Sequence, residues 1–140
     1  MTDTLTVFCD GGARGNPGPA AAAFVIKDPQ GKILGQAGCF LGKATNNVAE
    51  YQGVIEALKW IKDNLQLRTN NLEFFLDSKL IVNQLNGLYK IKNANLRILA
   101  IEVKRLEREV GGQVAYHLIP REKNYLADRL VNQTLDKETP

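Results

Sequence analysis

Four carboxylates are the residues of this chain whose types and positions could do chemistry. Asp10 and Asp77 each come directly after a short apolar run. Glu50 lies near the start of an apolar pattern with helical spacing, and Asp128 lies in the last amphipathic segment. Taken singly, each has an ordinary explanation as a turn residue, a helix cap, a partner of the helix dipole or a solvated surface group.

Taken together, these four residues could hold divalent cations. Carboxylates a few ångströms apart raise one another's pKa unless their charge is compensated. Magnesium prefers octahedral oxygen ligation and keeps room for waters and a substrate phosphate. Two such ions about 3.5–4 Å apart can hold both the attacking and the leaving oxygen of a phosphoryl displacement. The four residues therefore indicate a candidate site for metal-assisted phosphodiester chemistry.

Three strands are expected at the start of the chain. The apolar stretches Leu5–Cys9, Ala21–Ile26 and Lys32–Leu41 are short and bounded by turn residues, with Asp28-Pro29-Gln30-Gly31 between the last two. The first of them is expected to end at Asp10. Because short turns join them, they should form an antiparallel meander.

Helical periodicity begins after the third strand. Apolar residues recur with helical spacing from Val48 to Leu65, and Asn46 or Asn47 is placed to cap the start of this helix. A strand, two helices, a strand and a helix should follow, over Leu72–Leu76, Ser78–Leu85, Asn95–Val110, Gln113–Ile119 and Asn124–Leu135.

This order predicts an α/β fold with a mixed five-stranded sheet and helices on both faces. The fourth strand follows a crossover helix, so it should lie parallel to the first strand by the right-handed connection rule. Ligands of such sheets gather at the carboxyl ends of the strands. Asp10 and Asp77 end two of the strands, and the start of the crossover helix carries Glu50 to the same edge.

Composition limits the alternatives. The 140 residues, 44% of them hydrophobic, fit a single domain spanning residues 1–140. The net charge of +3 tolerates a polyanionic partner without requiring one. No secretory signal or membrane span is expected, so we predict a cytoplasmic protein. Cys9 and Cys39 form no CxxC pair and are expected to be buried thiols. The stretch Gly11–Gly18 lacks the following Gly-Lys-Ser/Thr of a P-loop and should form a wide turn.

Four segments carry the carboxylates in order along almost the whole chain. They are Phe8–Pro19, Thr45–Tyr51, Leu76–Leu80 and Asn124–Asn132. In these segments the chain resembles type 1 ribonucleases H, also called ribonuclease HI. The resemblance implies a ribonuclease H-like fold and an endoribonuclease that hydrolyses the RNA strand of RNA–DNA hybrids, with water attacking in line and leaving a 3′-hydroxyl and a 5′-phosphate.

The resemblance also implies roles for the carboxylates. Asp10 would bridge two Mg²⁺ ions, for which Mn²⁺ could substitute. Asp128 would help to hold the ion that activates the attacking water. Glu50 and Asp77 would hold the ion that stabilises the leaving oxygen.

Contacts with the two strands of the substrate are implied in the same way. The RNA strand, whose 2′-hydroxyls identify it, would be contacted by Asn16, Asn46 and the main chain at Gly11 and Gly12. Thr45 and Asn47 would bind a phosphate of the DNA strand.

Three features depart from the family pattern. Many members have a histidine in the loop before the last helix, where this chain has Pro120-Arg121-Glu122-Lys123, and Arg121 would contact a phosphate instead. Lys79 occupies a position where some members have a substrate-binding glutamine. No separate hybrid-binding domain is expected, so binding should be weaker and more distributive than in members with that domain. We also predict a monomer.

Two alternatives remain open from the sequence. A nuclease of the same fold could also act on double-stranded RNA. A non-catalytic nucleic-acid-binding module could keep the fold, although all four carboxylates are present.

Overall fold

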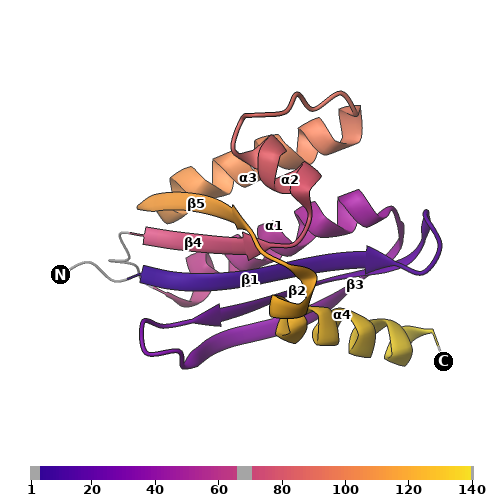
Figure 1. The fold of residues 1–140 in the computed structure, drawn as a ribbon, viewed down its shortest axis with the longest axis horizontal. Helices are drawn as coiled ribbons and strands as arrows, with labels where there is room; N and C mark the ends of the chain where they lie inside the picture. The colour runs from indigo at the N-terminus through magenta and orange to yellow at the C-terminus, as the bar shows by residue number, and fades with distance from the viewer. Residues whose placement is uncertain (1–3, 66–70, 140) are drawn as a thin grey trace.

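The computed structural model describes residues 4–65 and 71–139 and has the predicted α/β architecture (Figure 1). Five strands form one sheet in the order β3-β2-β1-β4-β5. The strands are β1 (Thr4–Ala13), β2 (Gly18–Lys27), β3 (Ile33–Ala44), β4 (Asn71–Leu76) and β5 (Gln113–Leu118). The helices are α1 (Asn46–Asn64), α2 (Lys79–Leu85), α3 (Ala94–Val110) and α4 (Tyr125–Glu138), with the 3-10 turn η1 at Arg121–Lys123.

The pairing of the strands confirms the predicted topology. β2 is antiparallel to both β1 and β3. β4 is parallel to β1, and β5 is parallel to β4. The sheet is therefore mixed, and its parallel half follows the crossover through α1.

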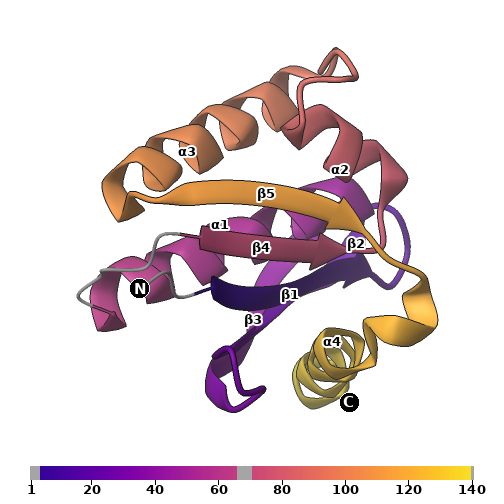
Figure 2. The ribbon, with the colours of Figure 1, turned by 60° about the vertical axis from the view of Figure 1, so that its left-hand side comes forward.

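Helices cover both faces of the sheet, as predicted (Figure 2). α1 and α3 pack on one face over the main core, whose largest fully buried side chains include Tyr51, Phe74 and Leu58. α4 packs on the opposite face, where Val131 and Leu135 contact Ala21 and Ala23 of β2. Because small alanines line this part of β2, α4 can approach the sheet closely.

β1 is longer than predicted. Asp10 was expected to end the strand, but β1 continues to Ala13 because Asp10–Ala13 pair with Ala20–Ala23 of β2. The wide turn expected from Gly11 onward is therefore limited to the residues between Ala13 and Gly18. Apolar content alone could not reveal this extension, because antiparallel pairing holds the polar and glycine residues in the strand.

The start of α1 also differs from the prediction. Thr45, rather than Asn46 or Asn47, is the N-cap, and its side-chain oxygen accepts a hydrogen bond from the Val48 amide (3.2 Å). The helix begins at Asn46, so Glu50 lies in its second turn and is buried at 7% exposure.

The cysteines are free thiols with different environments. Cys9 is buried in β1, but Cys39 is only half-buried, because β3 is an edge strand with one face partly open. No helix of the described residues is long and apolar enough to cross a membrane.

Candidate active site

Asp10, Glu50 and Asp77 meet at the carboxyl edge of β1 and β4. One carboxylate oxygen of each lies within 4.8 Å of the other two. Within residues 4–65 and 71–139, no other group of three or more His, Cys, Asp or Glu side chains comes together in this way. Phe8 of β1 pairs with Phe75 of β4. Two residues further along, β1 carries Asp10 and the chain directly after β4 carries Asp77. Strand register therefore places these two carboxylates side by side.

Glu50 reaches the cluster because β1 and α1 approach unusually closely. A Cβ atom at Gly11 would lie 2.2 Å from the Ala49 carbonyl carbon and 2.5 Å from the Glu50 amide nitrogen. A Cβ atom at Gly53 would lie 2.9 Å from the Asp10 carbonyl oxygen. Only glycine fits these two positions without displacing the backbone, so Gly11 and Gly53 set the distance between Asp10 and Glu50.

Burial and mutual repulsion perturb both acids. Burial, followed by the charge of Asp77, raises the pKa of Asp10 to about 7. Burial, followed by the charge of Asp10, raises the pKa of Glu50 well above its usual range. Without a cation the cluster therefore retains protons near neutral pH, and a bound cation would displace them.

The donor set fits a divalent cation. Three carboxylates supply the hard oxygen ligands that Mg²⁺ and related ions prefer. The Glu50 Oε2 atom is buried and has no hydrogen-bond partner. A buried acceptor without a donor is costly, and a cation would satisfy it.

A cavity of about 480 Å³ opens over the cluster and gathers most of the residues predicted for the site. Asp128 lines this cavity from α4, and its charge contributes to the raised pKa of Asp10, although it lies outside the group of three. The other predicted residues in the lining are Gly11, Gly12, Asn46, Asn47 and Arg121.

Asn16 and Thr45, by contrast, do not line the cavity and instead shape its rim. The Asn16 side-chain oxygen accepts a hydrogen bond from the Asn46 amide (3.0 Å), and the Asn46 side-chain oxygen accepts one from Ala13 (2.8 Å). These bonds join the β1–β2 turn to the start of α1. The side-chain oxygen of Thr45 is occupied by its capping bond.

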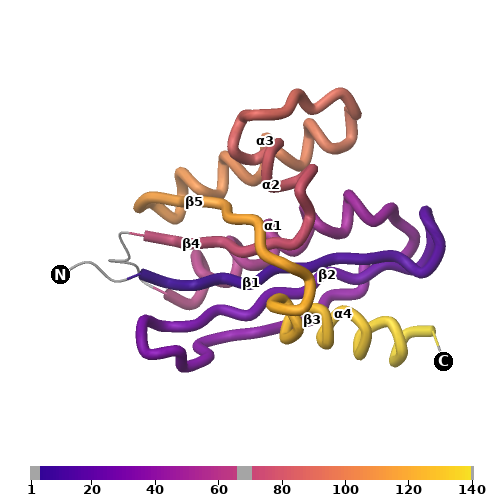
Figure 3. Tube along the Cα trace, in the orientation of Figure 1, coloured from indigo at the N-terminus to yellow at the C-terminus, as the bar shows by residue number. Residues whose placement is uncertain are grey.

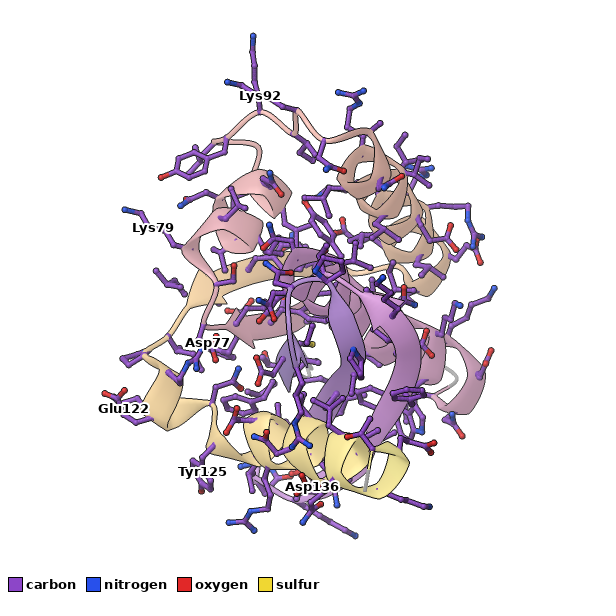
Figure 4. The ribbon with its side chains drawn as sticks, turned by 90° about the vertical axis from the view of Figure 1, so that its right-hand side faces the viewer. Asp77, Lys79, Lys92, Glu122, Tyr125 and Asp136 are labelled. Atoms are coloured by element: carbon purple, nitrogen blue, oxygen red, sulfur yellow. The ribbon has the colours of Figure 1, made fainter. Side chains whose placement is uncertain are left out.

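Lys79 also lies outside the lining of this cavity. In Figure 4 its side chain extends from α2 into solvent, away from the space in which Asp77 lies between α2 and α4. Arg121, in contrast, is brought to the rim by η1, which the sequence did not predict. His117 lies on β5, where its ring hydrogen-bonds to Glu73 (3.0 Å), outside the cavity.

Sequence reasoning missed three residues that shape the site. No sequence pattern pointed to Gly53, because its role is to allow the close approach of β1, a strand distant in sequence. Asn124 is 1% exposed and hydrogen-bonds to Asp77, yet it appeared only as part of a motif. Arg14 lines the cavity and pairs with Asp136 of α4 (2.5 Å). Figure 4 shows Asp136 on that helix, below Asp77.

Comparison with known proteins agrees with this geometry. The family model described as reverse transcriptase-like matches residues 8–134. The structure of LC11-RNase H1, isolated from compost, is 39% identical and superposes with a TM-score of 0.91 over 98% of this chain and 99% of that chain. This chain belongs to the ribonuclease HI family.

Two further relatives come from an archaeon and a bacterium. RNase H1 of Halobacterium salinarum NRC-1 is 34% identical and superposes with a TM-score of 0.89 over 96% of this chain and 98% of that chain. Bifunctional protein Rv2228c of Mycobacterium tuberculosis is 37% identical over 133 residues, which are 94% of this chain and 35% of that protein. The chain thus spans about a third of the length of this mycobacterial relative.

Proposed function

We propose that this protein is a metal-dependent endoribonuclease that cuts the RNA strand of RNA–DNA hybrids. The observation that carries the proposal is the group of Asp10 and Glu50, which are buried, and half-buried Asp77, whose carboxylate oxygens lie within 4.8 Å of one another in the lining of an open cavity. A relative 39% identical, LC11-RNase H1, has been crystallised with an RNA/DNA hybrid, which supports the choice of substrate. We further propose that residues 1–140 act as one catalytic domain.

The four carboxylates would hold two divalent cations, for which we propose Mg²⁺, with Mn²⁺ as a substitute. Asp10 is central, because its carboxylate lies beside those of Glu50 and Asp77 and its pKa responds to Asp128. When bound, such ions supply positive charge for the attacking and leaving oxygens of an in-line displacement and lower the pKa of the attacking water. Hydrolysis would leave a 3′-hydroxyl and a 5′-phosphate.

The chain's own residues would orient the substrate in this cavity. Gly11 and Gly12 bring main chain to its wall, and Asn46 lies beside them. The side-chain oxygen of Asn46 accepts a hydrogen bond from the Ala13 amide. Its side-chain nitrogen would therefore be the atom that donates to the RNA strand. Arg121, at the rim, would bind a phosphate in the place where many relatives carry a histidine.

A second groove provides room for the other strand. It has a volume of about 590 Å³ and is lined by Leu80, Leu88, Tyr89 and Lys90, among others. Asn47 lines both this groove and the carboxylate cavity, so the two are adjacent at the start of α1. We propose that the DNA strand lies here, with its sugars against the apolar side chains and its phosphates near the lysine.

A cleavage assay tests the proposal. Labelled RNA–DNA hybrid, double-stranded RNA and double-stranded DNA are incubated with the protein, with Mg²⁺, with Mn²⁺ or with a chelator. We expect metal-dependent cuts in the RNA of the hybrid, and none after Asp77→Asn, whereas Asp63→Asn at the exposed end of α1 should cleave normally. Equal cleavage of DNA, or cleavage without metal, would contradict the proposal.

Double-stranded RNA remains the second candidate substrate. An apolar groove disfavours the extra hydroxyls of a second RNA strand, so we expect slower cleavage than of the hybrid. Comparable rates on the two substrates would show that this groove does not select DNA.

A further inference from the structure

Asn124 is a buried polar residue at the junction between the catalytic edge of the sheet and α4. It precedes the first residue of α4 and is 1% exposed. Its side-chain nitrogen donates to the Cys9 carbonyl oxygen (2.8 Å) and to Asp77 Oδ2 (3.1 Å). Both hydrogens of the amide nitrogen are therefore used, one by β1 and one by a carboxylate of the cluster.

The same residue is bonded through its main chain. The carbonyl oxygen of Asn124 accepts a hydrogen bond from the Asp128 amide (3.1 Å) in the first turn of α4. Cys9 is the neighbour of Asp10 in β1. Asn124 thus hydrogen-bonds directly to the Asp77 carboxylate, to the carbonyl that precedes Asp10 and to the amide of Asp128. It therefore links three segments that carry carboxylates of the site.

The path of the chain explains why such a link is needed. After β5 the chain runs past β4 and β1 before α4 begins on the other face of the sheet (Figure 3). Apart from the Arg14–Asp136 pair near its C-terminal end, α4 packs on the sheet through apolar side chains, with Val131 and Leu135 on the alanines of β2. These apolar contacts are not directional, so they do not by themselves fix the start of the helix relative to Asp77.

A purely stabilising role does not account for the choice of asparagine. Its side-chain oxygen is buried without a hydrogen-bond partner, and an unpaired buried acceptor costs about 1–3 kcal/mol. An aspartate would lose both donated bonds and add another negative charge against Asp77. Of these two nearly isosteric side chains, the amide is the one that can hold a carboxylate and a carbonyl at once.

We propose that Asn124 is a positioning residue that fixes Asp77 and Asp128 relative to Asp10 in the arrangement that binds divalent cations. The effect of Asn124 on metal binding is inferred from the geometry of the cluster. The effect on catalysis rests on the proposed function. Substitution of groups that orient metal ligands typically lowers metal affinity or activity by about 10- to 100-fold. The same range is expected for Asn124.

Metal binding by the whole chain is the direct test. Mn²⁺ affinity is measured by titration calorimetry for wild type, Asn124→Ala and Asn124→Leu. Leucine keeps the shape of asparagine and removes both donors, so it separates the loss of hydrogen bonds from the loss of volume if the alanine variant unfolds. The control is Asn86→Leu, because the more exposed Asn86 side chain also donates to a strand carbonyl, that of Tyr116 (3.1 Å), away from the cluster.

We expect Asn124→Leu to bind Mn²⁺ about 10- to 100-fold more weakly, while Asn86→Leu binds as wild type does. In the cleavage assay, the Mg²⁺ concentration for half-maximal rate should rise in parallel, with the KM for hybrid unchanged. Wild-type Mn²⁺ affinity in a folded Asn124→Leu variant would overturn the proposal, as would an equal loss in Asn86→Leu. If wild type binds Mn²⁺ but cuts no hybrid, the proposed function fails, and the calorimetric comparison still decides the role of Asn124.

Discussion

Replacing Asp10 by asparagine should stabilise the metal-free protein while abolishing its activity. Asp10 is 6% exposed, and its pKa of about 7 lies far above the ordinary value of 3.8. Burial is the main cause, and the neighbouring Asp77 charge adds to it. Ionised Asp10 therefore lowers the free energy of unfolding, and an uncharged side chain at this position does not.

The sign and size of the effect follow from linkage. Because the folded pKa of Asp10 is raised, its contribution to stability is fully present below pH 3.8 and is lost as the pH rises through about 7. At about 1.4 kcal/mol per pKa unit, a shift from 3.8 to about 7 corresponds to about 4 kcal/mol at pH 8. Burial and the charge of Asp77 also raise the pKa of Glu50, so part of the cost of holding charge in the cluster remains in the variant. We expect a gain of about 2–4 kcal/mol at pH 8 and almost none at pH 4.

Thermal and urea unfolding measure this gain. Wild type, Asp10→Asn and the control Asp63→Asn are unfolded in chelator at several pH values from 4 to 8. At about 3 °C per kcal/mol, the Asp10 variant should melt at least about 6 °C above wild type at pH 8. Adding Mg²⁺ should raise the Tm of wild type and leave the variant almost unchanged, because the variant lacks the central ligand.

Two outcomes would refute the reasoning. One is an Asp10→Asn variant that is less stable than wild type at pH 8 in chelator. The other is a gain that does not change between pH 4 and pH 8, since it would then not arise from ionisation of Asp10. The exposed Asp63→Asn control should show no comparable pH-dependent gain.

Three further predictions concern the groups around the cluster. Gly11→Ala should abolish metal binding and lower the Tm, because its Cβ atom would lie 2.2 Å from the Ala49 carbonyl carbon. An Mn²⁺ affinity of this variant equal to that of wild type would contradict this. Thr45→Ala should cost about 1 kcal/mol in urea unfolding by removing the cap on Val48, and Thr45→Ser should restore most of it. Arg121→Ala should raise the KM for hybrid and reduce the slope of log affinity against log salt by about one. An unchanged slope would show that Arg121 contacts no phosphate.

The fold was predictable because its signals are local. Alternating or continuous apolar runs identified the five strands, and helical periodicity identified α1 and the later helices. The connection rule then fixed β4 as parallel to β1. Apart from the unpredicted turn η1, the main errors lie at the ends of elements: β1 gained Asp10–Ala13 by pairing with β2, and Thr45 rather than an asparagine caps α1. Such boundaries depend on partners that are distant in sequence.

By itself, the sequence determined that Asp10 and Asp77 would lie together, since both follow apolar runs that predict strands whose order and direction could be inferred. Only the tertiary structure decided how the remaining groups join them. Glu50 reaches the cluster because Gly11 and Gly53 let α1 and β1 approach closely. Asn124 contacts Asp77 because the chain passes the sheet edge before α4 begins. Contacts of this kind depend on the distance between packed elements, and no local pattern in the sequence records that distance.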